Sequence, residues 1–174
     1  MGRMAQGRWR RTAYAGAALL ALAALTACMP DPAPTPSPTG FASEEEAFAA
    51  AEDTYRAYID ALSARQTGDE SVDPLGFLTG QALEEAIDSD RQLELEQLEL
   101  RGPISVTALD QIDATVYSAS VHACVDMSKA RVLDATGTDI TPATRPDQFS
   151  VDIEAIWTSA GTLISQSTPS EEKC

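Results

Sequence analysis

Residues 114–127 read ATVYSASVHACVDM, and their alternating pattern decides the fold class. One set of alternate positions is small or apolar: Tyr117, Ala119, Val121, Ala123 and Val125. The intervening positions are more polar and include His122, Cys124 and Asp126. A period of two is typical of a half-buried β-strand. We expect the set from Tyr117 to Val125 to face the core and His122 to face solvent.

The same period continues on both sides of this stretch. Before it, Ile104, Val106 and Ala108 alternate beyond Gly102-Pro103. After it, a short strand around residues 131–134 precedes the turn DATGTD (134–139), and QFSVDIEAIWT (148–158) is followed by SAG and TLISQST (162–168). Short alternating runs separated by turn residues predict an antiparallel meander.

The chain before Gly102 has helical signals instead. Ser43 with Glu46 forms a capping box at the start of a helix that carries an apolar stripe up to Leu62 and is expected to stop at Gly68. Asp73-Pro74 predicts a short helical turn through Leu78. A third helix is expected from residue 79 or 80 to about 97, with a strand as the second interpretation of residues 93–100.

Helices followed by a meander predict an α+β domain with the helices on one face of the sheet. This order, with DPLGFLTGQALEEA (73–86), ACVDMSKARVLDATGTDITPATRPD (123–147) and the terminal Cys174, resembles the nuclear transport factor two-like fold. That resemblance implies a curved antiparallel sheet forming a cone with a cavity between helix and sheet. Together with LTAC (25–28), it also resembles small lipoproteins of actinobacteria.

The amino-terminal segment has the layout of a secretory signal. MGRMAQGRWRR carries no acidic residue, and the apolar run TAYAGAALLALAAL is shorter than the roughly 20 residues that a membrane span needs. LTAC resembles the bacterial lipobox, which implies cleavage between Ala27 and Cys28. The sulfur of Cys28 would then carry a diacylglyceryl group with palmitate-type chains. We therefore expect a lipid-anchored protein on the extracytoplasmic face of the cell membrane.

Three segments follow from this interpretation: a signal peptide (1–27), a lipidated Cys28 with a proline-rich linker (28–40), and a single α+β domain (41–174). Prolines at alternate positions favour an extended linker. With Cys28 lipidated, Cys124 and Cys174 remain, and two cysteines outside the cytoplasm most simply form a disulfide. The alternative, a pair of redox-active thiols, lacks the Cys-x-x-Cys arrangement.

The charge distribution excludes one class of partner. All 27 acidic residues follow Cys28, whereas four of the 12 basic residues precede it. Such a domain repels phosphate backbones, so we expect no nucleic-acid partner. His122 is the only histidine, and neither a metal-ligand set, a catalytic nucleophile motif nor a phosphate-binding loop is found, so no metal, cofactor or catalytic residue is predicted.

Two functional hypotheses remain. The first is a non-enzymatic module, tethered to the membrane through Cys28, that binds an envelope protein, a wall component or a small molecule. The alternative is an isomerase or cyclase that uses the cone cavity. Tyr55, Tyr58, His122 and Asp126 are the residues that would line such a pocket and transfer protons there.

Overall fold

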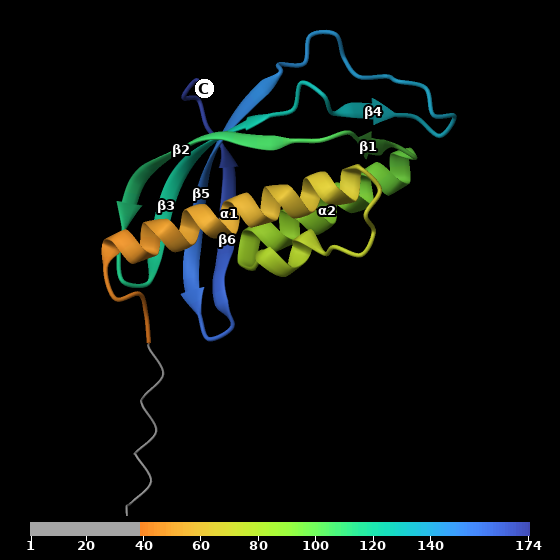
Figure 1. Ribbon diagram of the computed structural model, residues 1–174. Helices are drawn as coiled ribbons and strands as arrows, with labels where there is room; N and C mark the ends of the chain where they lie inside the picture. Colours follow the sequence, from red (N-terminus) through yellow and green to blue (C-terminus); the bar gives the residue numbers. More distant parts are fainter. Residues whose placement is uncertain (1–38) are drawn as a thin grey trace, which may run out of the picture. The chain divides into compact units, whose positions relative to one another are not determined.

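The computed structural model describes residues 39–174 (Figure 1). The helical elements are α1 (Glu44–Gln66), the 3₁₀ helix η1 (Pro74–Phe77) and α2 (Gly80–Glu96). The strands are β1 (Glu99–Arg101), β2 (Ser105–Ala114), β3 (Ser118–Asp126), β4 (Arg131–Leu133), β5 (Gln148–Thr158) and β6 (Gly161–Pro169). None of the helices within this range is long and apolar enough to span a membrane.

The strands form two antiparallel sheets. A four-stranded sheet has the order β2-β3-β5-β6, and a two-stranded sheet joins β1 to β4. The larger sheet is open and curved, and the helices lie on one of its faces (Figure 1). The expected α+β class, helices followed by a curved antiparallel sheet, is therefore confirmed.

Local sequence explains where the helices begin. The hydroxyl of Ser43 accepts from the Glu46 backbone N–H at 3.2 Å, and the Glu46 carboxylate accepts from the Ala42 backbone N–H at 2.8 Å. Asp73 caps η1 by accepting from the Leu75 N–H at 3.0 Å. These carboxylates and hydroxyls satisfy amide groups that a helix start leaves without an intrahelical partner.

The ambiguous stretch 93–100 divides between the two interpretations. Helix α2 continues to Glu96 and ends at Gln97, whose φ of 56° is left-handed. Strand β1 then begins at Glu99. The dense Glu, Leu and Gln residues thus continue the helix as expected. The left-handed Gln97 then ends the helix two residues before the strand begins.

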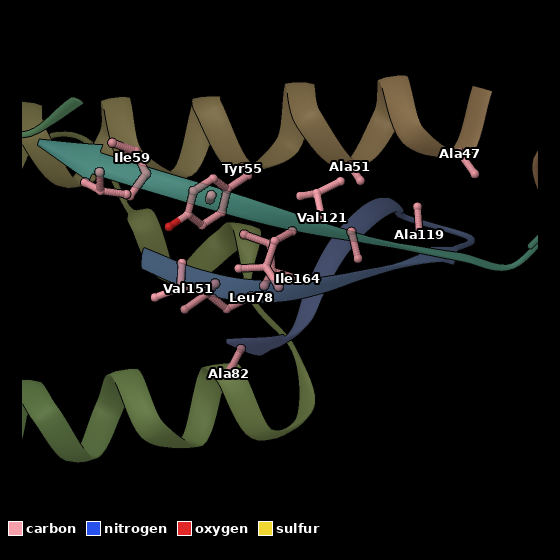
Figure 2. Packing of buried hydrophobic residues seen from close by; sticks show 14 of the residues in the cluster. Ala47, Ala51, Tyr55, Ile59, Leu78, Ala82, Ala119, Val121, Val151 and Ile164 are labelled. Carbon is pink, nitrogen blue, oxygen red and sulfur yellow. The ribbon is translucent and has the colours of Figure 1, made fainter. Parts of the chain in front are cut away.

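The core lies between α1 and the larger sheet. Figure 2 shows Ala47, Ala51, Tyr55 and Ile59 directed from α1 toward the strands. The small alanines let the first half of the helix approach the sheet closely, and Tyr55 and Ile59 fill the second half. Each of these four side chains is buried. On the sheet they meet a set of small and branched residues: Ala119, Val121, Ala123, Val125, Val151, Ile153, Ala155 and Ile164.

Two expectations for the strand at the centre of the sequence were wrong. Tyr117 is 63% exposed, because it belongs to the turn between β2 and β3 rather than to a strand. His122 is only 6% exposed, although it does lie on the face opposite the core. Its strand, β3, is an interior strand, so the side chain is flanked by Asp110 of β2 and Asp152 of β5.

Candidate functional site

A cavity of about 590 Å³ opens between the two long helices and one end of the sheet. Helix α1 crosses all four strands of the larger sheet and contacts β2 and β3 most, whereas α2 lies against β6 alone among these strands. The space between them is bounded by the second half of α1, η1, α2, β1 and the adjoining end of the larger sheet. This volume falls within the range of small-molecule sites.

The walls of the cavity are mostly apolar. Leucines and other apolar side chains come from every bounding element: Leu62, Leu75, Ala86, Leu93, Leu98, Leu100, Ile104, Met127 and Phe149. Most of these residues are partly exposed rather than buried, because they line a space that solvent can enter. An apolar surface of this kind gains free energy when a ligand removes it from water.

Arg65 and Asp90 join the two helices across this space. Nη1 and Nη2 of Arg65 donate to Oδ2 and Oδ1 of Asp90, each at 3.1 Å. Their side chains are 34% and 41% exposed, so water screens the pair and its contribution to stability is modest. The bidentate geometry fixes the orientation of both groups. The pair therefore links α1 to α2 and leaves neither charge free for chemistry.

The end of α1 is held by the turn between β1 and β2. The Gly102 N–H donates to the Gln66 carbonyl at 3.2 Å, and the Ile104 N–H donates to the Ser63 hydroxyl at 3.2 Å. Gly102 has φ of 101°, and a Cβ there would lie 2.4 Å from the Lys129 carbonyl oxygen. Only glycine meets both conditions. This contact fixes the position of Gln66 on the cavity wall.

Two polar side chains on the wall, Tyr58 and Gln66, are half-buried. Burial raises the pKa of the Tyr58 phenol, an effect that the Arg65 charge partly opposes and the Asp90 charge reinforces. The phenol is therefore neutral near neutral pH. Oε1 of Gln66 is buried and has no hydrogen-bond partner among residues 39–174. A buried acceptor without a donor is uncommon in folded proteins.

The four residues expected to line the pocket are not brought together. Tyr58 lines the cavity, whereas Tyr55 is 2% exposed and packs in the core beside it, with the two ring centroids 6.1 Å apart. His122 and Asp126 lie on the opposite face of the sheet, since they alternate with the core residues of β3. Of the four predicted residues, only Tyr58 lines the cavity.

The opposite face of the sheet holds the cysteine pair and His122. Cys124 and Cys174 form a disulfide-capable pair whose Cα atoms are 5.5 Å apart. Nδ1 of His122 lies 2.7 Å from Oδ1 of Asp152, and its buried Nε2 has no partner within residues 39–174. Asp126 accepts from the Ser128 N–H, which lowers the pKa of its carboxyl. Such a carboxylate is a poor proton donor near neutral pH.

Two further expectations concern a metal site and the predicted lipid attachment. Across residues 39–174, no group of three histidine, cysteine or acidic side chains is placed to hold a metal ion. Ala27 and Cys28, the predicted cleavage and lipidation positions, lie outside the described residues. Sequence reasoning missed Arg65, Gln66 and Asp90. No local sequence motif marks these residues. Arg65 and Gln66 lie at the end of α1, and Asp90 lies on the side of α2 that meets Arg65.

Comparisons with known proteins identify no family for this chain. No known protein family matches it, and no curated protein is significantly similar to it in sequence. The solved intermembrane-space region of the chloroplast protein ARC6 is 18% identical with a TM-score of 0.49, covering 69% of this chain and 95% of its own. The Kfla4162 protein from Kribbella flavida is 15% identical with a TM-score of 0.44, covering 75% of this chain and 95% of its own.

Proposed function

We propose that this protein is a lipoprotein of the cell envelope that binds a small apolar ligand in the cavity between α1, α2 and the sheet. Cys28 carries the lipid, and the domain works on the extracytoplasmic face of the membrane. The signal-like residues 1–27 and the lipobox-like LTAC support this location. The observation that carries the binding function is the apolar cavity itself.

The polar groups of the cavity favour binding over catalysis. Arg65 and Asp90 satisfy each other through two hydrogen bonds, and Arg101 pairs with Glu99 at 2.6 Å. A general acid and base need free groups with pKa values near the working pH. Burial moves the pKa of Tyr58 upward, away from that range. The arrangement therefore supports a site that holds a ligand without transforming it.

The isomerase or cyclase alternative has one observation in its favour. Tyr58 places a half-buried phenol on the cavity wall, and a neutral phenol can donate a hydrogen bond to a carbonyl oxygen. An isomerase also needs a base that removes the proton. His122 and Asp126 lie across the sheet from this cavity. The carboxylates of Glu70 and Glu94 line it but are exposed to water rather than enclosed beside Tyr58. We therefore rank enzymatic activity second.

Ligand retention tests the proposed binding function. We would purify the lipidated protein from its own membranes in mild detergent and record native mass spectra. Ala86→Trp places an indole in the cavity, and Ala49→Trp makes the same change at an exposed position of α1 outside it. We expect a bound small molecule in wild type and Ala49→Trp but not in Ala86→Trp. Equal occupancy in all three would contradict the proposal.

The same preparation separates binding from catalysis and tests the anchor. A ligand that leaves the protein with a changed mass after incubation supports the enzyme alternative. Partition into a detergent-rich phase tests lipidation, because Cys28→Ser removes the acceptor sulfur. Wild type should enter the detergent phase with the added lipid mass, and Cys28→Ser should not. If both proteins partition alike without added mass, lipidation of Cys28 is wrong.

A further inference from the structure

One end of the domain is formed by the β2–β3 turn and the β5–β6 turn. The two turns lie together, because the Trp157 N–H donates to the Tyr117 carbonyl at 2.8 Å. The chain enters the domain beside them. The Phe41 N–H donates to the Val116 carbonyl at 2.7 Å, and a Cβ on Gly40 would lie 2.5 Å from the same oxygen. The linker that leads from Cys28 therefore joins the domain at this end.

The two turns are uncharged in an otherwise acidic domain. Residues 114–118 and 155–170 contain no charged residue, whereas all 27 acidic residues of the chain follow Cys28. Acids border this end at Asp113 and Glu44, and no basic residue lies in residues 102–128. Of the six large apolar side chains exposed within residues 39–174, three lie next to or in the first turn: Ile112, Val116 and Tyr117. This end therefore presents apolar surface with no positive charge beside it.

Building on the proposed lipid anchor, we propose that the hairpin tip formed by Ile112, Val116 and Tyr117 docks on the bilayer that holds Cys28. The aliphatic side chains gain free energy on leaving water, and a tyrosine ring suits the interface because it joins an apolar body to a polar hydroxyl. Residues 29–40 reach at most about 37 Å as an extended proline-rich segment. The tether therefore holds the tip at an effective concentration on the order of millimolar, at which even a weak contact is occupied.

Docking of the hairpin tip also decides which way the cavity faces. Helix α1 starts beside the tip and runs toward β1 (Figure 1). Its 23 residues span about 35 Å. The cavity is bounded by the second half of this helix, so it lies at the opposite end of α1 from the tip. A domain docked through the tip holds the cavity away from the bilayer, and its ligand enters from water rather than from the lipid.

Trp157 supplies a natural probe for this contact. The chain has two tryptophans, Trp9 and Trp157, so removal of residues 1–27 leaves only Trp157, next to Tyr117. We would place the full lipidated chain in phosphatidylcholine vesicles with brominated acyl chains, which quench nearby tryptophans, and in the same lipid without bromine. We expect the brominated lipid to lower the fluorescence of wild type. High salt should leave this loss unchanged, because the contact is apolar rather than ionic.

Single charges assign the contact to the hairpin tip. Tyr117→Asp and Val116→Asp should each abolish the quenching, because a carboxylate resists transfer out of water. Both side chains are exposed, so neither change disturbs the core. Leu95→Asp is the matched control. It adds the same charge at an exposed apolar position near the end of α2 and should keep the wild-type quenching. Circular dichroism checks that each variant is folded.

The mass of the same protein separates this inference from the anchor on which it rests. A chain that carries the lipid but is not quenched overturns the docking and leaves the anchor intact. A tip covered by the linker or by a second copy would give that result. Quenching that persists in both Tyr117→Asp and Val116→Asp, that disappears in Leu95→Asp or that is lost at high salt also overturns it. A chain without added lipid mass overturns the anchor and the docking together.

Discussion

The two faces of the larger sheet are built from alternate residues of the same strands, yet they become buried in different ways. Toward the helices, Val121, Ala123 and Val125 of β3 are fully covered by apolar neighbours. On the opposite face, His122 and Cys124 are 6% and 4% exposed, although no helix covers them. The first face is covered by an amphipathic helix, and the second by specific polar and covalent partners.

The chain terminus supplies much of the cover on the second face. The hydroxyl of Ser150 donates to the carbonyls of Ser170 and Glu172, at 3.1 and 2.6 Å, and Cys174 then reaches Cys124. These contacts carry the tail across β5 toward β3. Burial on a polar face therefore depends on a few directed contacts, whereas burial on the helix-covered face is spread over many side chains.

Substitutions at two neighbouring residues of β3, one on each face, should give the largest difference in the free energy of unfolding. Val121→Asn places an amide in the apolar core without partners and removes a buried side chain. We expect a loss of about 4 kcal/mol in the free energy of unfolding. Ser120→Asn, on the opposite and partly exposed face, should change it by less than about 0.5 kcal/mol. Urea unfolding followed by circular dichroism measures both, and equal losses would mean that the faces are not energetically distinct.

Removing the disulfide between Cys124 and Cys174 should cause the next largest loss of stability. Cys124 and Cys174 are 50 residues apart in sequence, and in the loop-entropy model closing such a loop stabilises a protein by up to about 4 kcal/mol. We expect Cys174→Ser to cost about 3 kcal/mol, with Lys173→Ser as the neutral control in the same tail. Urea unfolding without reductant measures the difference. A Cys174→Ser protein as stable as Lys173→Ser would show that the tail is held without the bond.

The His122–Asp152 contact should contribute less than the disulfide. Asp152→Asn keeps the shape but weakens the hydrogen bond to a buried imidazole, which should cost about 2 kcal/mol. Asp113→Asn changes the same charge on an exposed position of the same face and should cost less than about 0.5 kcal/mol. The measurement is again urea unfolding. If the two variants lose the same amount, the general charge of this face matters more than the specific contact.

The same contrast explains how much of the fold could be predicted. The period of two placed Val121 and His122 on opposite faces, and the capping signals at Ser43 and Asp73 placed two helix starts correctly. These features depend on residues close together in sequence. Whether His122 is exposed depends instead on Asp152, 30 residues away, and on strand order. No local pattern encodes that order.

The candidate site was harder to predict than the fold for the same reason. Tyr58 could be selected because tyrosines on an apolar helix stripe are visible in the sequence. Arg65 and Asp90 look like ordinary surface charges of two separate helices, and only the packing of α1 and α2 brings them within 3.1 Å. The burial of Oε1 of Gln66 without a partner among residues 39–174 is likewise a property of the assembled fold rather than of its sequence neighbours.

A substitution at Tyr55 should change the free energy of unfolding least. This residue places a phenol hydroxyl within the helix-covered face. Burial raises the pKa of its phenol above the ordinary 10.0, so the folded protein keeps a proton that the unfolded chain releases. Above pH 10.0 the unfolded state therefore binds fewer protons, and stability falls as the pH rises, by about 1.4 kcal/mol per pH unit for this group. Below that pH its contribution is fully present.

Tyr55→Phe tests this expectation directly. The hydroxyl makes no hydrogen bond within residues 39–174, so the substitution should change stability at pH 7 by less than about 1 kcal/mol. Between pH 10 and 11 the variant should lose about 1 kcal/mol less than wild type, in urea unfolding at matched ionic strength, because the unfolded phenol is only half ionised at pH 10. Identical slopes would mean that this phenol reaches water when it ionises. The helix-covered face would then be less tightly closed around Tyr55 than around Val121, and the two faces of the sheet would differ less than their composition suggests.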